Sequence, residues 1–302
     1  MGFFYEARQF IMKPICRFHC KITNFSVILH PLFFVNDAIV EPIISETFFL
    51  SAGETNAEKE MALTVLVSKF IDIATLHANS LHIGNPDMAD KKAGWVLARL
   101  DISMKSLPLV NESYTISTWI EGFNRHFSTR CFEVTAADGT VHGQARSVWV
   151  VIDTFTHSNI GISHFSLPDE LILGKSVNVP DRSRHIPKIC QDVTDHEEKN
   201  CLRATVPPLE HTFLYCDLDY YRHVNTVRYV ALLLNQFSLD FHDHHRIKGL
   251  ELSFLHEAVY GKQNLLYRSD DTHNLSSAFS LNRKEDDTQL FFAKVFFENR
   301  SN

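Results

Sequence analysis

Residues 55–84 read TNAEKEMALTVLVSKFIDIATLHANSLHIG, a pattern that predicts one long helix. Thr55 and Glu58 have the spacing of a capping box, in which two side chains satisfy free backbone N–H groups at a helix start. Gly84 ends the run. The apolar residues recur close to the helical period, at Met61, Val65, Phe70, Ile73 and Ala74. Because they occupy more than one side of the helix, we expect it to be buried.

Strand-like segments surround this helix. Before it, residues 38–50 read AIVEPIISETFFL, which indicates a strand that enters a turn. After it come three segments with strand-like patterning, at residues 94–104, 114–123 and 127–153. The ADGT turn at residues 137–140 divides the last of these into a hairpin. The first half is therefore predicted to be a strand, a long helix and several antiparallel strands.

The same order returns in the second half. Residues 217–230 read DLDYYRHVNTVRYV and lead into a helical run. Its apolar stripe consists of Val224, Val227, Ala231 and Leu234. Strand-like segments follow at residues 248–261, 264–269, 275–283 and 290–299. Between the halves, residues 166–206 carry prolines and clustered charges, which are typical of a connection.

The two halves can be superimposed as a weak repeat. LDISM at residues 100–104 matches LELSF at residues 250–254, and residues 131–140 match residues 278–287. An antiparallel sheet needs a cover for its apolar face, and a central helix supplies it. A long helix wrapped by such a sheet, used twice, predicts an α+β protein with a tandem hotdog fold.

The repeat also predicts the boundaries of the units. We expect a leader at residues 1–38, an N-terminal hotdog at 39–165, a linker at 166–206 and a C-terminal hotdog at 207–302. The leader shows no secretory cleavage site, although an organelle transit peptide stays open as an alternative. No apolar run reaches the ~18 residues of a membrane span.

Charge and cysteine content exclude some classes of protein. The net charge is −7, from 29 Lys and Arg against 36 Asp and Glu, whereas nucleic-acid-binding domains usually carry a basic face. The six cysteines lack the paired spacing of a zinc site, so we expect reduced thiols. Reduced thiols favour a cytoplasmic location, with a plastid as the alternative.

A cluster of polar residues precedes the second helix. Asp219, Tyr221, His223 and Asn225 lie at its start, where free N–H groups and a partial positive charge favour a developing oxyanion. A histidine there can position or deprotonate a water. The competing interpretation is structural, because an acidic residue before a helix is also a common cap.

The two halves differ at this cluster. Counted back from Phe70 and Phe237, Asn56 is placed opposite His223. Counted from the shared strand at residues 100–104 and 250–254, Leu107 is placed opposite Glu257. The first half is therefore expected to be scaffold and ligand tunnel, and the second half to be the reactive end.

These residues give the sequence a resemblance to the acyl-[acyl-carrier-protein] thioesterases of plants and bacteria. The resemblance rests on residues 217–230 and 250–258 in the second half, and on residues 77–84 and 95–122 in the first. It implies a tandem hotdog that hydrolyses the thioester between a fatty acyl chain and the phosphopantetheine arm of the acidic carrier protein. It implies no metal or organic cofactor.

The resemblance also implies the site residues. Family members use an Asp, an Asn and a His from one run and a Glu from a later strand, which here map to Asp219, Tyr221, His223 and Glu257. Tyr221 stands at the Asn position, where its phenol either donates to the thioester carbonyl or crowds the site. Ala258 stands where relatives often carry Cys, which removes a thiol nucleophile and leaves water attack.

The position of Glu257 raises a geometric question. Strict alternation along residues 250–257 places Glu257 on the opposite face from His256. A bulge, or a site at the seam between the two hotdogs, would bring Glu257 to His223. Without either, His256 would be the nearer partner.

Some alternatives concern ligands and partners. FHDHHR at residues 241–246 is interpreted as a polar loop rather than a metal site. A basic docking patch for the carrier protein is expected at Arg222, Arg228, Lys248 and Lys262. An acyl-CoA thioesterase and a non-catalytic acyl-binding protein are the rival functions, and both a monomer and a homodimer fit the tandem pattern.

Overall fold

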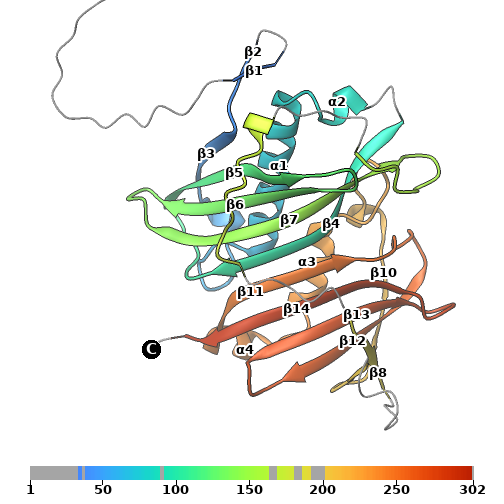
Figure 1. Ribbon diagram of the computed structural model, residues 1–302. Helices are drawn as coiled ribbons and strands as arrows, with labels where there is room; N and C mark the ends of the chain where they lie inside the picture. The colour runs from blue at the N-terminus through green and yellow to red at the C-terminus, as the bar shows by residue number, and fades with distance from the viewer. Residues whose placement is uncertain are drawn as a thin grey trace, which may run out of the picture. The chain divides into compact units, whose positions relative to one another are not determined.

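Ten antiparallel strands form one continuous sheet that runs through both halves of the sequence (Figure 1). Their order is β10-β12-β13-β14-β11-β4-β7-β6-β5-β3. The first half contributes β3 (Ile43–Phe49), β4 (Ala93–Met104), β5 (Ser113–Phe123), β6 (Ser128–Ala136) and β7 (Val141–Asp153). The second half contributes β10 (Leu209–Thr212), β11 (His245–Phe254), β12 (Gln263–Asp271), β13 (Ser276–Arg283) and β14 (Gln289–Asn299).

The computed structural model describes residues 33–35, 38–88, 92–162, 169–179, 186–191 and 201–300. The leader predicted at residues 1–38 lies almost wholly outside these residues, as do Cys16 and Cys20. The described residues belong to a single unit that spans 32–302. In this part of the chain, no helix combines the length and the apolar character needed to cross a membrane.

Two central helices cover the same face of the sheet. α1 (Leu63–Ser80) belongs to the first half and α3 (Thr226–Leu234) to the second, and the two helices contact each other. α1 buries a face that includes Leu66, Phe70 and Ile73. Phe70 stacks on Phe132 of β6 with ring centroids 4.6 Å apart, which ties the helix to the sheet.

The predicted start of the first helix is wrong. α1 begins at Leu63 with Ala62 as its N-cap, and Thr55 instead pairs with Met61 in an isolated bridge. The Thr55 hydroxyl donates to the backbone oxygen of Ala52 rather than to a helix N–H. Residues 55–61 therefore close a loop before the helix, and apolar periodicity alone does not separate such a loop from a first helical turn.

A pseudo-twofold axis relates the halves at the pairing of β4 and β11. Asp101 lies opposite Glu251, and the partners on either side are Leu100 with Leu252 and Ile102 with Leu250. Adding 150 to Leu100 and subtracting 150 from Leu252 gives the pair Leu250 and Ile102, which is also observed. The match of residues 100–104 with residues 250–254 is therefore confirmed.

The linker contains a feature that the sequence did not predict. β8 (Lys188–Cys190) and β9 (Cys201–Arg203) pair in parallel, and Cys190 forms a disulfide with Cys201 across a Cα–Cα distance of 6.2 Å. The prediction of reduced thiols is wrong for this pair, because the fold brings together two cysteines whose spacing carries no signal. Cys131 is a buried free thiol and Cys216 an exposed one.

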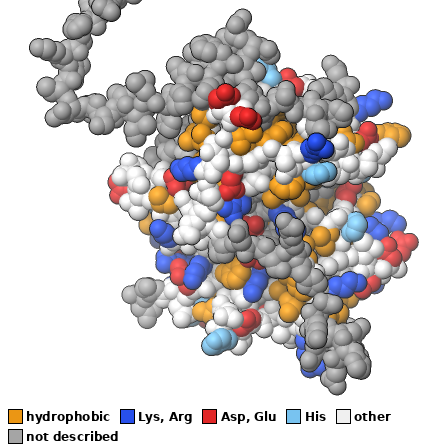
Figure 2. All heavy atoms as spheres, viewed as in Figure 1, with side chains coloured by type: hydrophobic (Ala, Val, Ile, Leu, Met, Phe, Trp, Pro, Cys, Tyr) orange, Lys and Arg blue, Asp and Glu red, His pale blue; other side chains and the backbone are white. Residues whose placement is uncertain are grey.

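The surface carries mixed charge. Figure 2 shows acidic and basic side chains interspersed among polar and apolar ones on the face in view. This distribution agrees with the modest net charge of −7.

Candidate functional site

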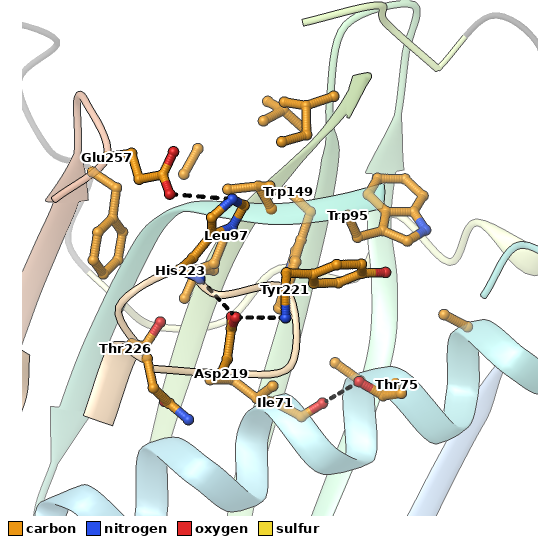
Figure 3. Close-up of a pocket in the computed structure, with 18 of the residues that line it drawn as sticks. Ile71, Thr75, Trp95, Leu97, Trp149, Asp219, Tyr221, His223, Thr226 and Glu257 are labelled. Atoms are coloured by element: carbon orange, nitrogen blue, oxygen red, sulfur yellow. Dashed lines mark hydrogen bonds and ion pairs between the residues drawn. The ribbon is translucent and has the colours of Figure 1, made fainter. Parts of the chain in front are cut away.

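A cavity of about 600 Å³ lies where the two halves meet (Figure 3). The first half lines it with α1, β4 and β7, through residues such as Ile71, Leu97 and Trp149. The second half contributes the loop before α3, including Asp219 and His223, together with the segment after β11. The cavity is mainly apolar, with polar groups gathered at the loop, as is typical of small-molecule sites.

Asp219 holds the loop that carries His223. Its Oδ1 accepts hydrogen bonds from the backbone N–H of Tyr221 at 2.9 Å and of His223 at 3.0 Å. The backbone N–H of Asp219 in turn donates to the His223 oxygen at 2.8 Å. Arg222 takes a left-handed φ of 68° so that the chain can close this turn. Asp219 therefore fixes the backbone of His223 and does not contact its ring.

Asn225 ends the loop and begins the helix. Its φ and ψ are extended, and its Oδ1 accepts a hydrogen bond from the N–H of Val227 at 3.1 Å, which makes it the N-cap of α3. Thr226, the first helical residue, lines the cavity. The positive end of the helix thus faces the cavity beside His223.

Glu257 lies between two histidines. His223 Nε2 is 3.3 Å from Glu257 Oε1, and His157 Nδ1 is 2.9 Å from Oε2. The two imidazole rings meet edge to face, with centroids 5.3 Å apart. Each carboxylate oxygen therefore has its own imidazole partner at the mouth of the cavity.

The chain after β11 explains how Glu257 reaches His223. β11 ends at Phe254, and the N–H groups of Leu255 and His256 both donate to the oxygen of Leu290. Two consecutive residues opposite one partner form a bulge-like step, which ends the alternation that placed Glu257 on the far face. Glu257 rather than His256 contacts His223, and it does so at the seam between the halves.

Tyr229 of α3 supports the same segment. The ring of Tyr229 packs on Phe254 and Phe291, and its hydroxyl is hydrogen bonded to the backbone of Ala258. Burial raises the pKa of Tyr229, so its phenol stays protonated. Ala258 is fully buried behind this contact, and the segment that carries Glu257 is held to the helix that follows His223.

Tyr221 occupies a wall of the cavity. Figure 3 shows its ring extending toward Trp95, on the side away from Glu257. The ring stacks on Tyr220 with centroids 4.0 Å apart and is 6.2 Å from the His223 ring. A Cβ on Gly94 would lie 3.6 Å from the Tyr221 hydroxyl, so glycine at this place leaves room for the bulky ring.

His157 is a site residue that the sequence analysis missed. It follows β7 in a turn where Asp153 Oδ1 accepts from the N–H groups of Phe155 and Thr156. His157 itself has a left-handed φ of 57°, and its N–H donates to the Asp153 oxygen. Asp at a strand end signals the turn, but the contact with a residue 100 positions later depends on the fold.

The first half has a corresponding loop, and it shows that the predicted alignment is wrong by four residues. The N–H of Asn56 donates to the Glu60 oxygen, and Asn56 Oδ1 accepts from the Glu60 N–H, as Asp219 does with His223. Asn56 thus corresponds to Asp219, and Glu60 to His223. Counting from the helix ends failed because α1 has 18 residues and α3 only 9.

Glu60 closes that loop instead of opening a site. Arg300 donates from Nη1 to Glu60 Oε1 at 2.9 Å and from Nη2 to Oε2 at 2.8 Å. The counterpart of Glu257 is Leu107, since Asn111 and Gly261 take the same left-handed turn 150 residues apart. An ion pair and an apolar side chain therefore stand where the second half has His223 and Glu257.

The histidine-rich stretch at residues 241–246 is not the predicted loop. It forms the end of α4 (Leu239–His244) and the start of β11. His242, His244 and His245 each lie within hydrogen-bond distance of a backbone oxygen. Among the described residues, one group offers metal-ligand atoms within 4.8 Å of one another: His157, His223 and Glu257.

The predicted basic patch is only partly at the site. Arg222 is exposed on the loop that carries His223. Arg228 pairs with Asp217 at 3.9 Å and Lys262 with Glu285 at 3.7 Å. Lys248 lies near the start of β11, six residues and thus about 20 Å before its end.

Comparisons with known proteins place this geometry in a family. Models of the N-terminal and C-terminal domains of acyl-ACP thioesterases match residues 42–163 and 208–297. A chloroplastic palmitoyl-acyl carrier protein thioesterase of Gossypium hirsutum is 21% identical over 233 residues, which are 74% of this chain and 54% of the relative. The chloroplastic oleoyl-acyl carrier protein thioesterase 2 of Arabidopsis thaliana is 23% identical over 228 residues, 70% and 59% of the two chains. The chain thus spans about half the length of the curated relatives it matches.

Solved structures share the fold. An acyl-ACP thioesterase from Bacteroides thetaiotaomicron superimposes with a TM-score of 0.73 and 23% identity, over 85% of this chain and 98% of the other. The 12:0-ACP thioesterase from Umbellularia californica gives a TM-score of 0.68 and 18% identity, over 86% and 95%. The predicted tandem hotdog is confirmed. Because the two domain models match well over half of the sequence, the chain belongs to the acyl-ACP thioesterase family.

Proposed function

We propose that this protein hydrolyses the thioester of fatty acyl-[acyl-carrier-protein] and releases the free fatty acid. The contact between His223 and Glu257 at the mouth of an apolar cavity carries the proposal. It places a base and a carboxylate beside a space that fits an acyl chain, in a chain of the matching family.

In the proposed reaction, water is the nucleophile. Both oxygens of Glu257 accept from imidazole N–H groups, so His223 carries its proton on Nε2 and its lone pair on Nδ1. His223 Nδ1 takes a proton from water as the water oxygen bonds to the thioester carbon. The C–S bond then breaks, and the proton passes to the leaving sulfur. Glu257 stabilises the imidazolium between these steps, and the positive end of α3 favours the oxyanion.

The remaining site residues shape this arrangement. Asp219 acts as a positioning residue, because its carboxylate holds the backbone of His223. Tyr221 acts as a wall of the acyl cavity, a role that its orientation supports better than contact with the thioester carbonyl. The N-terminal hotdog supplies most of the cavity wall and so is proposed to be the acyl tunnel.

The partner in this proposal is the acyl-carrier protein, and the mouth of the cavity offers a surface for it. Arg222, Tyr220 and Phe155 are exposed there, and Tyr220 also lines the cavity. A cation beside exposed aromatic rings suits an acidic protein that delivers a lipid chain. The cytoplasmic location stays a prediction, and the names of the plant relatives keep a plastid in view.

Release of free thiol from acyl-carrier protein by the purified chain tests the function. We expect His223→Ala and Glu257→Gln to lower kcat by about a hundredfold or more, because proton transfer loses its base or the base loses its carboxylate. His256→Ala, an adjacent residue that also lines the cavity, is the matched control and should retain most activity. Equal activity of wild type and His223→Ala would contradict the proposal. Preincubation with a chelator separates this route from one through a metal held by the same three side chains.

A further inference from the structure

A buried guanidinium lies on the wall of the acyl cavity. Arg130 of β6 is 4% exposed and lines the same cavity as His223. Its Nη1 donates to His77 Nδ1 at 2.8 Å and to Thr118 Oγ1 at 3.4 Å. Within the described residues, no carboxylate forms an ion pair with this guanidinium.

The partners of Arg130 leave its charge uncompensated. His77 Nε2 faces the backbone oxygen of Glu41 at 3.1 Å and donates to it, so Nδ1 presents a lone pair to Arg130. Burial, and then the charge of Arg130, lower the pKa of His77 to about 3, so the imidazole is neutral at physiological pH. Burial lowers the pKa of Arg130 only to about 10, so the guanidinium remains a cation.

An uncompensated buried cation is costly, and proteins rarely keep one without an anionic or metal partner. In the described structure the recorded contacts of Arg130 use Nη1, and its guanidinium borders the cavity. A ligand in the cavity is therefore in a position to supply the missing negative charge. A guanidinium binds a carboxylate with two parallel hydrogen bonds, which is its most favourable pairing.

Two further polar groups line this cavity. Asn79 Oδ1 is buried without a hydrogen-bond partner among the described residues, and Ser128 is 4% exposed. Ser128 precedes Arg130 by two residues on β6, so both side chains lie on the same face of the strand. A cavity built only for a hydrocarbon chain would place apolar side chains at these positions.

We propose that the cavity accepts acyl chains that carry a second, free carboxylate, which pairs with Arg130. The natural substrate would then be a half-thioester of a dicarboxylic acid rather than a plain fatty acyl thioester. This inference rests on the proposed thioesterase function and narrows its substrate class.

The test compares three acyl-carrier-protein substrates of matched chain length: one ending in a methyl group, one in a carboxylate and one in the methyl ester of that carboxylate. We expect wild-type kcat/KM to be at least about tenfold higher for the carboxylate than for either neutral chain, since a charge-assisted hydrogen bond is worth that factor. In Arg130→Met this ratio should fall to about one or below. Wild-type preference for the methyl-terminated chain, or an unchanged ratio in Arg130→Met, would overturn the proposal.

Two controls keep the result interpretable. Arg146→Met removes a guanidinium from the neighbouring strand β7 that pairs with Glu121 outside the cavity, and it should leave the substrate ratio unchanged. Arg130→Lys keeps a cation and should retain part of the preference. Thermal unfolding reports whether each variant folds, and removal of an uncompensated buried charge by Met favours folding.

Binding of the free acids separates failure of this proposal from failure of the thioesterase function. Calorimetry of the dicarboxylic and monocarboxylic acids needs no turnover. If no substrate releases thiol, the proposed function fails, but at least tenfold tighter binding of the diacid by wild type than by Arg130→Met would still support the carboxylate site. Equal binding of the two acids by wild type would overturn it.

Discussion

Glu257 connects two imidazoles that come from different halves of the molecule. His223 belongs to the loop before α3, whereas His157 follows β7 of the first half. With both carboxylate oxygens engaged, the side chain is held in one orientation toward His223. His157 thus acts as a positioning residue, because it contacts Glu257 and not the proposed path of the water.

Substitution of His157 tests this role. We expect His157→Ala to lower kcat roughly tenfold to a hundredfold, the equivalent of one charge-assisted hydrogen bond, with little change in KM. It should also shift the pH dependence of kcat, because a freed Glu257 oxygen changes the electrostatic environment of His223. The measurement is a pH profile of thiol release.

His157→Gln provides the matched comparison, because its amide keeps an N–H donor at this place. We expect it to recover part of the lost activity and of the wild-type pH profile. A His157→Ala variant with an unchanged profile would show that the contact is merely structural.

At this scale the sequence predicted some site residues and missed others. His223 and Glu257 were expected to be partners on the strength of the family resemblance, while strand alternation argued for His256. The step after Phe254, where two N–H groups share the Leu290 oxygen, is a matter of hydrogen bonding that alternation does not encode. His157 and Arg130 required the fold, because each meets its partner across a long sequence separation.

The helices and strands show where pattern reasoning succeeds. Strand pairing preserves the offset of 150 residues between β4 and β11, because both strands cross the same pseudo-twofold axis. At the helix starts the offset is 163 residues, from Ala62 to Asn225. The first half therefore holds 13 more residues between these points, mainly in the longer α1, and an alignment anchored at the helix ends cannot recover that difference.

The linker strands β8 and β9 carry the disulfide between Cys190 and Cys201. Ile189 of β8 packs on Ala278 and Phe292 of the C-terminal sheet, far along the sequence from the cavity residues. We expect reduction, or Cys190→Ser with Cys201→Ser, to lower the free energy of unfolding by about 3 kcal/mol or less, the value for closing a loop of this size. Thermal unfolding with and without a reductant measures the change.

Thiol release should be unaffected by the same treatment, because neither cysteine lines the cavity. Cys131→Ser is not a suitable control, since Cys131 is buried in the sheet. Cys216→Ser is suitable because this free thiol is exposed. An unfolding transition that does not respond to reductant would contradict a disulfide in the folded protein.

The whole molecule contains two related loops and one cavity site. The sister loop is tied by Glu60 to Arg300, near the C-terminal end of the described chain, and this pair connects the first half to the second. The loop of His223 is free of such a tie and borders the cavity. Duplication of the fold thus separates the tasks, with one loop joining the halves and the other available for chemistry.

This asymmetry leaves one mouth at which a carrier protein could dock, and Arg222 is the cation on its rim. We expect Arg222→Glu to raise KM for acyl-carrier protein severalfold with little change in kcat, because charge at a rim acts on encounter more than on chemistry. The effect should shrink at high salt, which screens exposed charges. The same acyl chain on CoA lacks the acidic protein surface and should be affected less.

Lys248→Glu is the matched control for Arg222→Glu, because it makes the same charge change on an exposed residue about 20 Å before the end of β11. If docking occurs at the rim, Lys248→Glu leaves KM for acyl-carrier protein near the wild-type value. Equal increases of KM in both variants would instead indicate a general effect of net charge. An equal increase for the CoA and carrier-protein substrates in Arg222→Glu would show that Arg222 acts on the acyl thioester itself and not on the carrier.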